Sequence, residues 1–116
     1  MPALQLWAYV QAVPESTRAI IALGKRDAAF DAGLPITSLH YRPDAGQVPQ
    51  PAPSDWKITA MMDQHAFMSI PAGADLKVGD MLAFDISHPC LTFDKWRQVL
   101  LVDEQYNVTG AVQTLF

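Results

Sequence analysis

Alternating apolar and polar positions predict that most of this chain forms short β-strands. Apolar side chains occupy every second position from Leu4 to Val10, which predicts a first strand at about residues 4–13. The other short apolar runs that favour strands are residues 18–24, 37–42, 81–87, 99–102 and 108–115. Turn-forming residues separate these runs, so the pattern indicates successive antiparallel strands.

The stretch from Trp56 to Ile70 is the longest candidate strand. Its two alternating faces both carry apolar side chains, and neither face is cleanly polar. This pattern is typical of a central strand that is covered on both sides. A strand broken by a bulge near Asp63 fits the same pattern.

The segments between the strands carry recognisable turn and loop signals. Residues 25–35 form a charged loop, and residues 43–53 hold four prolines and a glycine, which argues against regular structure there. Residues 76–80 predict a tight turn, residues 103–107 a hairpin loop, and Thr92–Trp96 one helical turn. The expected fold is therefore all-β, an antiparallel barrel or sandwich of seven or more strands with at most short helical turns.

Composition narrows the class of protein. A chain of 116 residues is expected to form one domain over residues 1–116, and 50% hydrophobic residues are enough for one core. The net charge is −4 and the eight basic residues are scattered, which argues against nucleic-acid binding. The sequence has no long apolar run and no secretory signal, so we expect no membrane insertion. Its single cysteine, Cys90, cannot form an internal disulfide, which favours a cytoplasmic location.

The tripeptide His88-Pro89-Cys90 is the sharpest chemical feature. Proline restricts the preceding residue to extended conformations, and residues i and i+2 of an extended chain point to the same side. Imidazole nitrogen and thiolate sulfur are preferred zinc ligands, so the pair predicts a metal site with positions left open for water or substrate. The alternative is a cysteine buried in a core strand and a histidine at a loop mouth.

Asp63 and His65 form a second candidate site, because a carboxylate and an imidazole stand on one strand face in an apolar stretch. If buried there, each would need a hydrogen-bond partner or a ligand. The alternative is a polar network at the end of a strand. His40 is expected at the surface, whereas Trp56 and Trp96 are expected to anchor a core or an interface.

Four motifs stand out when the chain is taken as a whole: Leu23-Gly-Lys-Arg-Asp27, Asp31-Ala-Gly-Leu-Pro35, Met62-Asp-Gln-His65 and His88-Pro-Cys-Leu-Thr-Phe-Asp-Lys-Trp96. Together they resemble the C-terminal domain of D-serine dehydratase-like proteins. That family groups with D-threonine aldolases in the alanine-racemase-type class (fold type III) of enzymes that use pyridoxal phosphate. The resemblance implies a β domain of an amino-acid dehydratase or deaminase that acts on D-amino acids.

The resemblance also implies roles for individual residues. His88 and Cys90 correspond to the family's zinc ligands, and the metal would help the substrate β-hydroxyl to leave. Aldolase relatives have an aspartate in place of the cysteine, so Cys90 favours the dehydratase branch. His65 corresponds to an active-site histidine, and Asp63 to a segment that lines the active-site entrance.

Such enzymes place an α/β barrel of about 250 residues before this domain, and a barrel lysine holds the cofactor. None of the four lysines here stands in a comparable context, so we expect an isolated domain that is inactive alone. The barrel would then be its partner in a homodimeric parent that binds an amino-acid substrate. An apolar face that would meet the barrel is expected around Met61, Met62, Phe67 and Trp96.

Three alternatives stay open at this stage. The parent could be an aldolase or a racemase of the same class. The domain could also be a non-catalytic binding module, in which case Cys90→Ala would leave the parent's activity intact. A small stand-alone metal hydrolase would need a third ligand from His65 or Asp63 and a general base.

Overall fold

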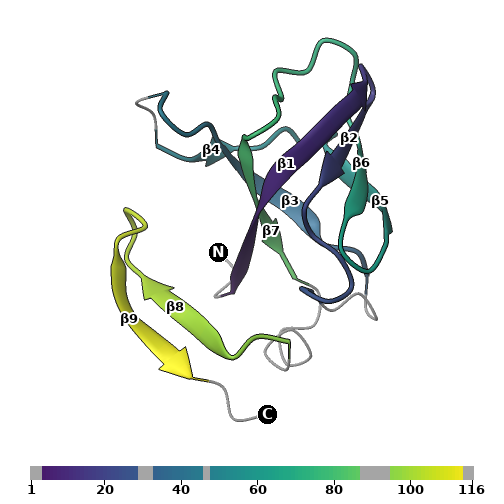
Figure 1. Cartoon of the computed structure of the whole chain (residues 1–116). Coiled ribbons are helices and arrows are strands. Elements are labelled where there is room, and N and C mark those ends of the chain that lie inside the picture. Colours follow the sequence, from purple (N-terminus) through teal and green to yellow (C-terminus); the bar gives the residue numbers. More distant parts are fainter. Residues whose placement is uncertain (1–3, 29–32, 46–47, 87–94, 114–116) are drawn as a thin grey trace.

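The computed structural model describes residues 4–28, 33–45, 48–86 and 95–113, and these residues contain strands, turns and loops but no helix (Figure 1). Seven strands form one antiparallel sheet in the order β4-β3-β7-β1-β2-β6-β5, and β8 and β9 form a separate hairpin. The strands are β1 (Gln5–Glu15), β2 (Arg18–Ile21), β3 (Ile36–Tyr41), β4 (Gln50–Pro51), β5 (Lys57–Met61), β6 (Ala66–Ser69), β7 (Met81–Asp85), β8 (Gln98–Val102) and β9 (Val108–Gln113). The all-β prediction is confirmed, with the large sheet forming a half-barrel.

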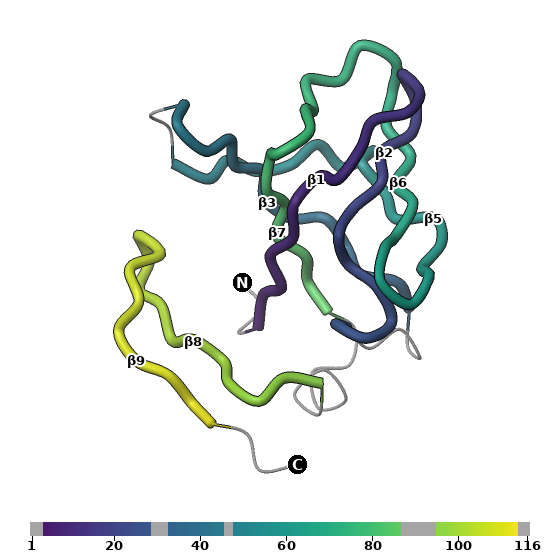
Figure 2. Tube along the Cα trace, in the orientation of Figure 1, coloured from purple at the N-terminus to yellow at the C-terminus, as the bar shows by residue number. Residues whose placement is uncertain are grey.

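The long strand β1 curves the large sheet by joining its two halves. Residues Gln5 to Tyr9 pair with β7, and the strand pairs with β2 from Val10 onward. The register between β1 and β2 shifts on both sides of Ala12, and such irregularities bend a strand and increase its twist. The two halves of the sheet therefore wrap around one interior instead of lying flat (Figure 2).

One apolar core fills the concave side of the large sheet. The inward positions of β1 alternate as the sequence predicts, and β7 is covered most completely, with Leu82, Ala83 and Phe84 all 0% exposed. Trp56 is also buried, as expected. Core residues from the other elements include Ala19, Ile21, Leu23, Ala28, Ile58, Met61, Ala66, Met68 and Ile70.

The prediction of one long strand from Trp56 to Ile70 is wrong. The structure has two strands there, β5 and β6, which pair with each other and are joined by a turn at residues 62–65. The backbone N–H of Met62 donates to the carbonyl oxygen of His65 at 2.7 Å and closes this turn. An alternating pattern has the same period in one strand and in a hairpin, so the pattern did not locate the reversal.

Two loop predictions require different corrections. The proline-rich stretch 43–53 is not wholly irregular, because Gln50 and Pro51 pair with β3. Pro51 is tolerated because β4 is an edge strand of the sheet. The predicted helical turn at Thr92–Trp96 lies largely outside the described residues.

The turns at residues 76–80 and 103–107 are confirmed. The N–H of Asp80 donates to the carbonyl of Lys77 at 3.0 Å, and Gly79 has a positive φ of 92° that glycine adopts without strain. At the second turn, the N–H of Tyr106 donates to the carbonyl of Asp103 at 3.0 Å.

The β8–β9 hairpin exposes large apolar side chains. Its most exposed large apolar residues are Leu100 at 56%, Leu101 at 48%, Val102 at 45%, Val108 at 61% and Val112 at 45%. The apolar face was expected elsewhere, around Met61, Met62, Phe67 and Trp96. That prediction is wrong for Met61, which is 6% exposed, although Met62 and Trp96 are exposed by 41% and 39%.

In the described part of the chain, no helix has the length and apolar character that crossing a membrane requires.

Candidate functional site

Two segments that the sequence analysis singled out lie side by side. The loop at residues 24–28 packs against the turn at residues 62–65 through backbone hydrogen bonds. The N–H of Lys25 donates to the carbonyl of Met62 at 2.8 Å, and the N–H of Arg26 donates to the carbonyl of Asp63 at 3.1 Å. The β5–β6 turn is therefore held in place by a loop about forty residues earlier in the sequence.

Gly24 permits this close approach. A Cβ atom at position 24 would overlap the backbone carbonyl of Asp63, and it would also lie 2.5 Å from the backbone nitrogen of Gln64. Real Cβ atoms do not come that close to a backbone, so any larger residue would push the loop and the turn apart. The glycine is required by space, because its backbone lies outside the positive-φ region.

Asp27 connects the same loop to a third segment. Its carboxylate oxygen Oδ2 accepts a hydrogen bond from the N–H of Gly24 at 3.0 Å, which closes the loop on itself. The indole Nε1 of Trp96 donates to the carbonyl oxygen of Asp27 at 2.8 Å. Trp96 ends the segment that carries the predicted metal ligands, so the structure brings parts of three motifs together at one end of strands β2, β5 and β6.

The side chains of Asp63 and His65 do not lie as predicted. Both residues belong to the turn and not to a shared strand face. Asp63 is exposed, so water solvates its carboxylate and it needs no buried partner. His65 is half-buried, and its ring meets the ring of Phe67 edge-to-face with centroids 6.3 Å apart. The two side chains are thus presented at the rim of the domain.

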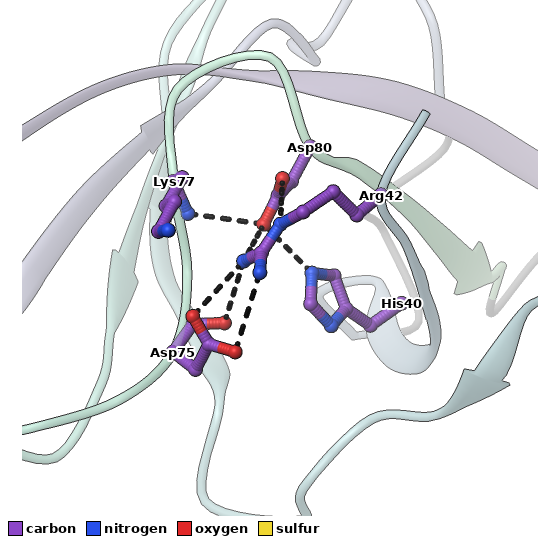
Figure 3. Close-up of polar contacts among 5 residues, drawn as sticks. All are labelled: His40, Arg42, Asp75, Lys77 and Asp80. Atoms are coloured by element: carbon purple, nitrogen blue, oxygen red, sulfur yellow. Dashed lines mark hydrogen bonds and ion pairs between the residues drawn. The ribbon is translucent and has the colours of Figure 1, made fainter. Parts of the chain in front are cut away.

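A charged cluster that the sequence analysis missed lies around Asp80 (Figure 3). Asp80 is 2% exposed and its carboxylate accepts hydrogen bonds from two side chains of the β3 region. The distances are 2.8 Å to His40 Nε2, 2.9 Å from Oδ1 to Arg42 Nε, and 2.9 Å from Oδ2 to Arg42 Nη2. The backbone N–H of Lys77 also donates to Oδ2 at 3.0 Å.

Arg42 links the buried carboxylate to the surface, because it also pairs with exposed Asp75 at 3.0 Å. Burial alone would raise the pKa of Asp80, but the hydrogen bonds from Arg42, His40 and the Lys77 N–H outweigh it and lower that pKa. The hydrogen bond from Arg42 likewise lowers the pKa of Asp75. The Arg42 pKa is raised, chiefly by its hydrogen bond to Asp80, so Arg42, Asp75 and Asp80 are all charged at neutral pH.

The expectation that His40 is a surface residue is wrong. Its side chain is 18% exposed, and its ring packs edge-to-face on Trp56 with centroids 5.2 Å apart. A signal was present, since His40 and Arg42 are two residues apart on a strand and so share a face. A shallow depression of about 470 Å³ lies beside His40 and Trp56, and neither Asp63 nor His65 lines it.

His88 and Cys90 lie outside the described residues, so their pairing as metal ligands stays a prediction. Within residues 4–28, 33–45, 48–86 and 95–113, no group of three or more metal-ligating side chains converges. Imidazole nitrogen and thiolate sulfur form a donor pair that zinc accepts.

Comparison with protein families settles the family. Residues 3–102 match the sequence model of the family described as "Putative serine dehydratase domain". The chain belongs to the serine dehydratase domain family. No curated protein sequence matches this serine dehydratase-type domain.

The fold of the serine dehydratase-type domain recurs in solved structures. A crystal structure of D-threonine aldolase from Filomicrobium marinum matches 95% of this chain with a TM-score of 0.65 and 18% sequence identity. The match covers 26% of the aldolase chain, so this chain spans about a quarter of that protein. At this identity the likeness establishes the fold alone.

The lysines of the domain do not fit the role of holding pyridoxal phosphate. A lysine that forms an imine with a cofactor is typically desolvated in a pocket. Lys25, Lys57, Lys77 and Lys95 are all exposed.

Proposed function

We propose that this chain is the C-terminal, metal-binding domain of a pyridoxal-phosphate-dependent dehydratase or deaminase that acts on D-amino acids. In this proposal His88 and Cys90 hold zinc, and Asp63 and His65 line the entrance to the active site. The observation that carries the proposal is the contact between the residue 24–28 loop, the residue 62–65 turn and Trp96. The family match over residues 3–102 supports the same interpretation.

The geometry of the contact between the loop and the turn favours a role in shaping a site that another domain completes. Backbone hydrogen bonds and the contact at Gly24 hold the turn, while the side chains of Asp63 and Gln64 stay exposed. Fixed backbone with free polar side chains is typical of binding loops on a rigid scaffold. His65 is restrained by Phe67, so its imidazole is more strongly oriented than Asp63.

The metal and the cofactor have separate tasks in this proposal. Zinc held by His88 and Cys90 would supply a Lewis acid for the substrate hydroxyl, and pyridoxal phosphate held by another domain would supply an electron sink for the α-carbon. The residues of this chain hold the metal through nitrogen and sulfur, narrow the entrance and present an imidazole able to move a proton. Cys90 favours the dehydratase over the aldolase branch.

The rest of the parent enzyme is proposed to cover the β8–β9 hairpin. The five apolar residues at its surface are exposed by 45–61%, and contiguous exposed apolar patches commonly mark interaction sites. An α/β barrel domain is the proposed partner, and the parent is proposed to be a homodimer. The chain described here would then lack activity on its own.

The test is metal binding by the purified chain, measured by elemental analysis and by titration with Zn²⁺. The wild-type chain is expected to hold close to one zinc ion, and His88→Ala and Cys90→Ala are expected to lose it. His65→Ala serves as the matched control and is expected to keep the metal. Unchanged zinc content in both ligand variants would refute the metal assignment.

The same experiment separates the proposed function from a stand-alone metal hydrolase. That alternative needs a third ligand from the 62–65 turn, so it predicts zinc loss in His65→Ala or Asp63→Ala. The exposure of Asp63 and the packing of His65 on Phe67 favour retention of zinc in both variants.

A further inference from the structure

The shallow depression beside the Asp80 cluster has no part in the proposed function. Its volume is about 470 Å³, and its polar lining consists of the side chains of His40, Asp55, Trp56 and Asp75. Small apolar residues from two turns complete the lining: Pro53, Pro71, Ala72, Gly73 and Ala74. The depression therefore combines apolar walls with a few polar groups, which is the usual composition of a ligand site.

The imidazole of His40 has one nitrogen in use and one available. Burial raises the pKa of Asp80, but the hydrogen bonds from Arg42 and His40 outweigh burial, so the carboxylate is ionised at neutral pH. An ionised carboxylate only accepts hydrogen bonds, so His40 Nε2, at 2.8 Å from Asp80 Oδ2, carries the hydrogen. In neutral His40 the other nitrogen, Nδ1, is then an acceptor. It lies on the side of the ring away from Asp80, and none of the described residues donates to it (Figure 3).

The direction of this acceptor is fixed by the fold. The His40 ring packs edge-to-face on Trp56 with centroids 5.2 Å apart, and Asp80 holds its other side. Asp80 is held in turn by Arg42 and by the backbone N–H of Lys77. A ligand that donates to Nδ1 would meet an oriented group, so little entropy is lost in ordering the site.

The charges around the depression favour a cation. Asp75 pairs with Arg42 at 3.0 Å, and Lys77 also acts on the Asp75 carboxylate through its charge. These two cations balance the two carboxylates of Asp75 and Asp80. Asp55 is exposed and forms no ion pair with any of the described residues, so its negative charge is the one left over.

The same lining offers few hydrogen-bond donors. The backbone N–H of Ala74 donates to the carbonyl of Pro71 at 3.1 Å, and the N–H of Trp56 donates to that of Pro53 at 3.2 Å. The two prolines have no N–H at all. Among the side chains that line the depression, the indole of Trp56 is the single donor once His40 Nε2 is bound to Asp80. An anion would therefore bind poorly here, whereas a positively charged donor matches the lining.

We propose that this depression binds a primary alkylammonium group. The ammonium has three N–H donors and no acceptor, so it can donate to Nδ1 of His40 while its charge faces Asp55. Its aliphatic stem packs on Trp56 and the neighbouring prolines. This site is separate from the proposed function, because neither Asp63 nor His65 lines the depression.

The test is an NMR titration of the purified, 15N-labelled chain at about pH 8, above the range in which histidines ordinarily titrate. The probes are n-butylammonium, n-butanol and n-butyrate, which share one apolar stem and differ in charge. The ammonium is expected to bind most tightly and butyrate least. The Nδ1 signal of His40 is expected at the position of an unprotonated imidazole nitrogen and to move more than the Nε2 signal when the ammonium is added.

Asp55→Asn removes the unbalanced charge without touching a buried group. Ammonium affinity is expected to fall by about 5-fold, the upper range for an exposed ion pair, while butanol affinity stays unchanged. Asp44→Asn is the matched control, because Asp44 is exposed, lies outside the lining and has a positive φ of 65° that asparagine also tolerates. This control is expected to bind all three probes as the wild-type chain does.

Two sources of the same chemistry are distinguished by one more probe. Tighter binding of Nα-acetyl-lysine methylamide than of n-butylammonium would indicate a lysine side chain of a partner protein, and weaker binding a small free amine. Equal affinity for the three charge variants, wild-type ammonium affinity in Asp55→Asn, or a His40 ring protonated on Nδ1 in place of Nε2 would each overturn the proposal.

Discussion

The curved seven-stranded sheet and the β8–β9 hairpin are built from similar sequences but differ in what covers them. Strand β7 reads Met-Leu-Ala-Phe-Asp and β8 reads Gln-Val-Leu-Leu-Val. In β7 the three central residues are 0% exposed, whereas in β8 Leu100 and Leu101 are exposed by 56% and 48%. An apolar run therefore predicts a strand in both regions, but burial depends on which partner the strand meets.

The two regions are also held by different contacts. The large sheet encloses a core and the Asp80 cluster, which ties the β3 region to the turn before β7. The hairpin is attached to the sheet at its loop, where Tyr106 meets Trp7 edge-to-face with centroids 5.3 Å apart and donates to Gln5. An isolated two-stranded hairpin is marginally stable in water, so the hairpin depends on these contacts with the large sheet.

The largest expected effect contrasts one leucine from each region. Leu82→Ala removes a fully buried side chain and is expected to destabilise the domain by about 2–5 kcal/mol. Leu100→Ala removes a side chain that is 56% exposed and is expected to change stability by less than about 0.5 kcal/mol. Urea unfolding of both variants tests this, and equal losses would mean that the hairpin is buried in solution.

The next largest loss of stability is expected when the buried Asp80 cluster is disrupted. Asp80→Ala leaves His40 and Arg42 without their buried partner and is expected to cost about 3 kcal/mol, near the lower end for breaking a buried pair. The lower end applies because the Arg42 side chain is 28% exposed and keeps Asp75. The matched control is Asp75→Ala, whose exposed carboxylate is expected to matter far less in the same unfolding experiment.

Substitutions of two glycines form a matched pair with a smaller expected loss of stability. Gly24→Ala forces a side chain into the backbone at Asp63 and is expected to destabilise by about 1–3 kcal/mol. Gly110→Ala in the hairpin places its Cβ 3.5 Å from Leu101 Cδ1, an ordinary contact that should be tolerated. Thermal unfolding measures both, and a Gly24→Ala domain as stable as wild type would contradict the close packing of loop and turn.

The sequence predicted the elements of the large sheet better than their arrangement. Alternation located β1, and short apolar runs located β2, β3 and β7, because covered strands leave these signatures in the local sequence. The reversal at residues 62–65 was missed, since Asp63 and Gln64 break the pattern no more than a bulge would. Pairing of β1 with both β7 and β2 depends on contacts between distant residues, which no local pattern records.

The candidate site was predicted in part for the same reason. The Gly24 and Asp63 segments were each singled out, but only the folded chain shows that their backbones are hydrogen-bonded. The Asp80 cluster was missed because its members come from residues 40, 42, 75 and 80, and each looks like an ordinary surface charge in sequence. Burial of Asp80 is a property of the turn geometry that Gly79 makes possible.

Acid pH is expected to weaken the large sheet through Asp80. Its pKa is lower in the folded than in the unfolded state, so its contribution to stability is present in full above the unfolded value of about 4. That contribution is lost as the pH falls below about 4 and through the folded pKa, because protonation removes the charge that Arg42 and His40 bind. Urea midpoints measured from pH 7 to pH 3 should fall less steeply in Asp80→Asn than in wild type.

The smallest expected effect concerns the attachment of the hairpin. Tyr106 has a positive φ of 64°, an uncommon conformation for this residue, and the Asp103 carboxylate supports the loop by accepting from the N–H groups of Gln105 and Asn107 at 2.9 Å each. Tyr106→Phe keeps the ring contact with Trp7 but loses the hydrogen bond to Gln5, which is expected to cost about 1 kcal/mol.

Hydrogen exchange shows which strands lose stability in Tyr106→Phe. The amides of β8 and β9 are expected to exchange faster in Tyr106→Phe, and faster again in Tyr106→Ala, while the amides of β7 keep their protection. Faster exchange throughout both regions would contradict a hairpin that opens independently. Selective exchange in the hairpin would instead mean that the hairpin opens without the large sheet, and that the Tyr106 contacts limit this opening.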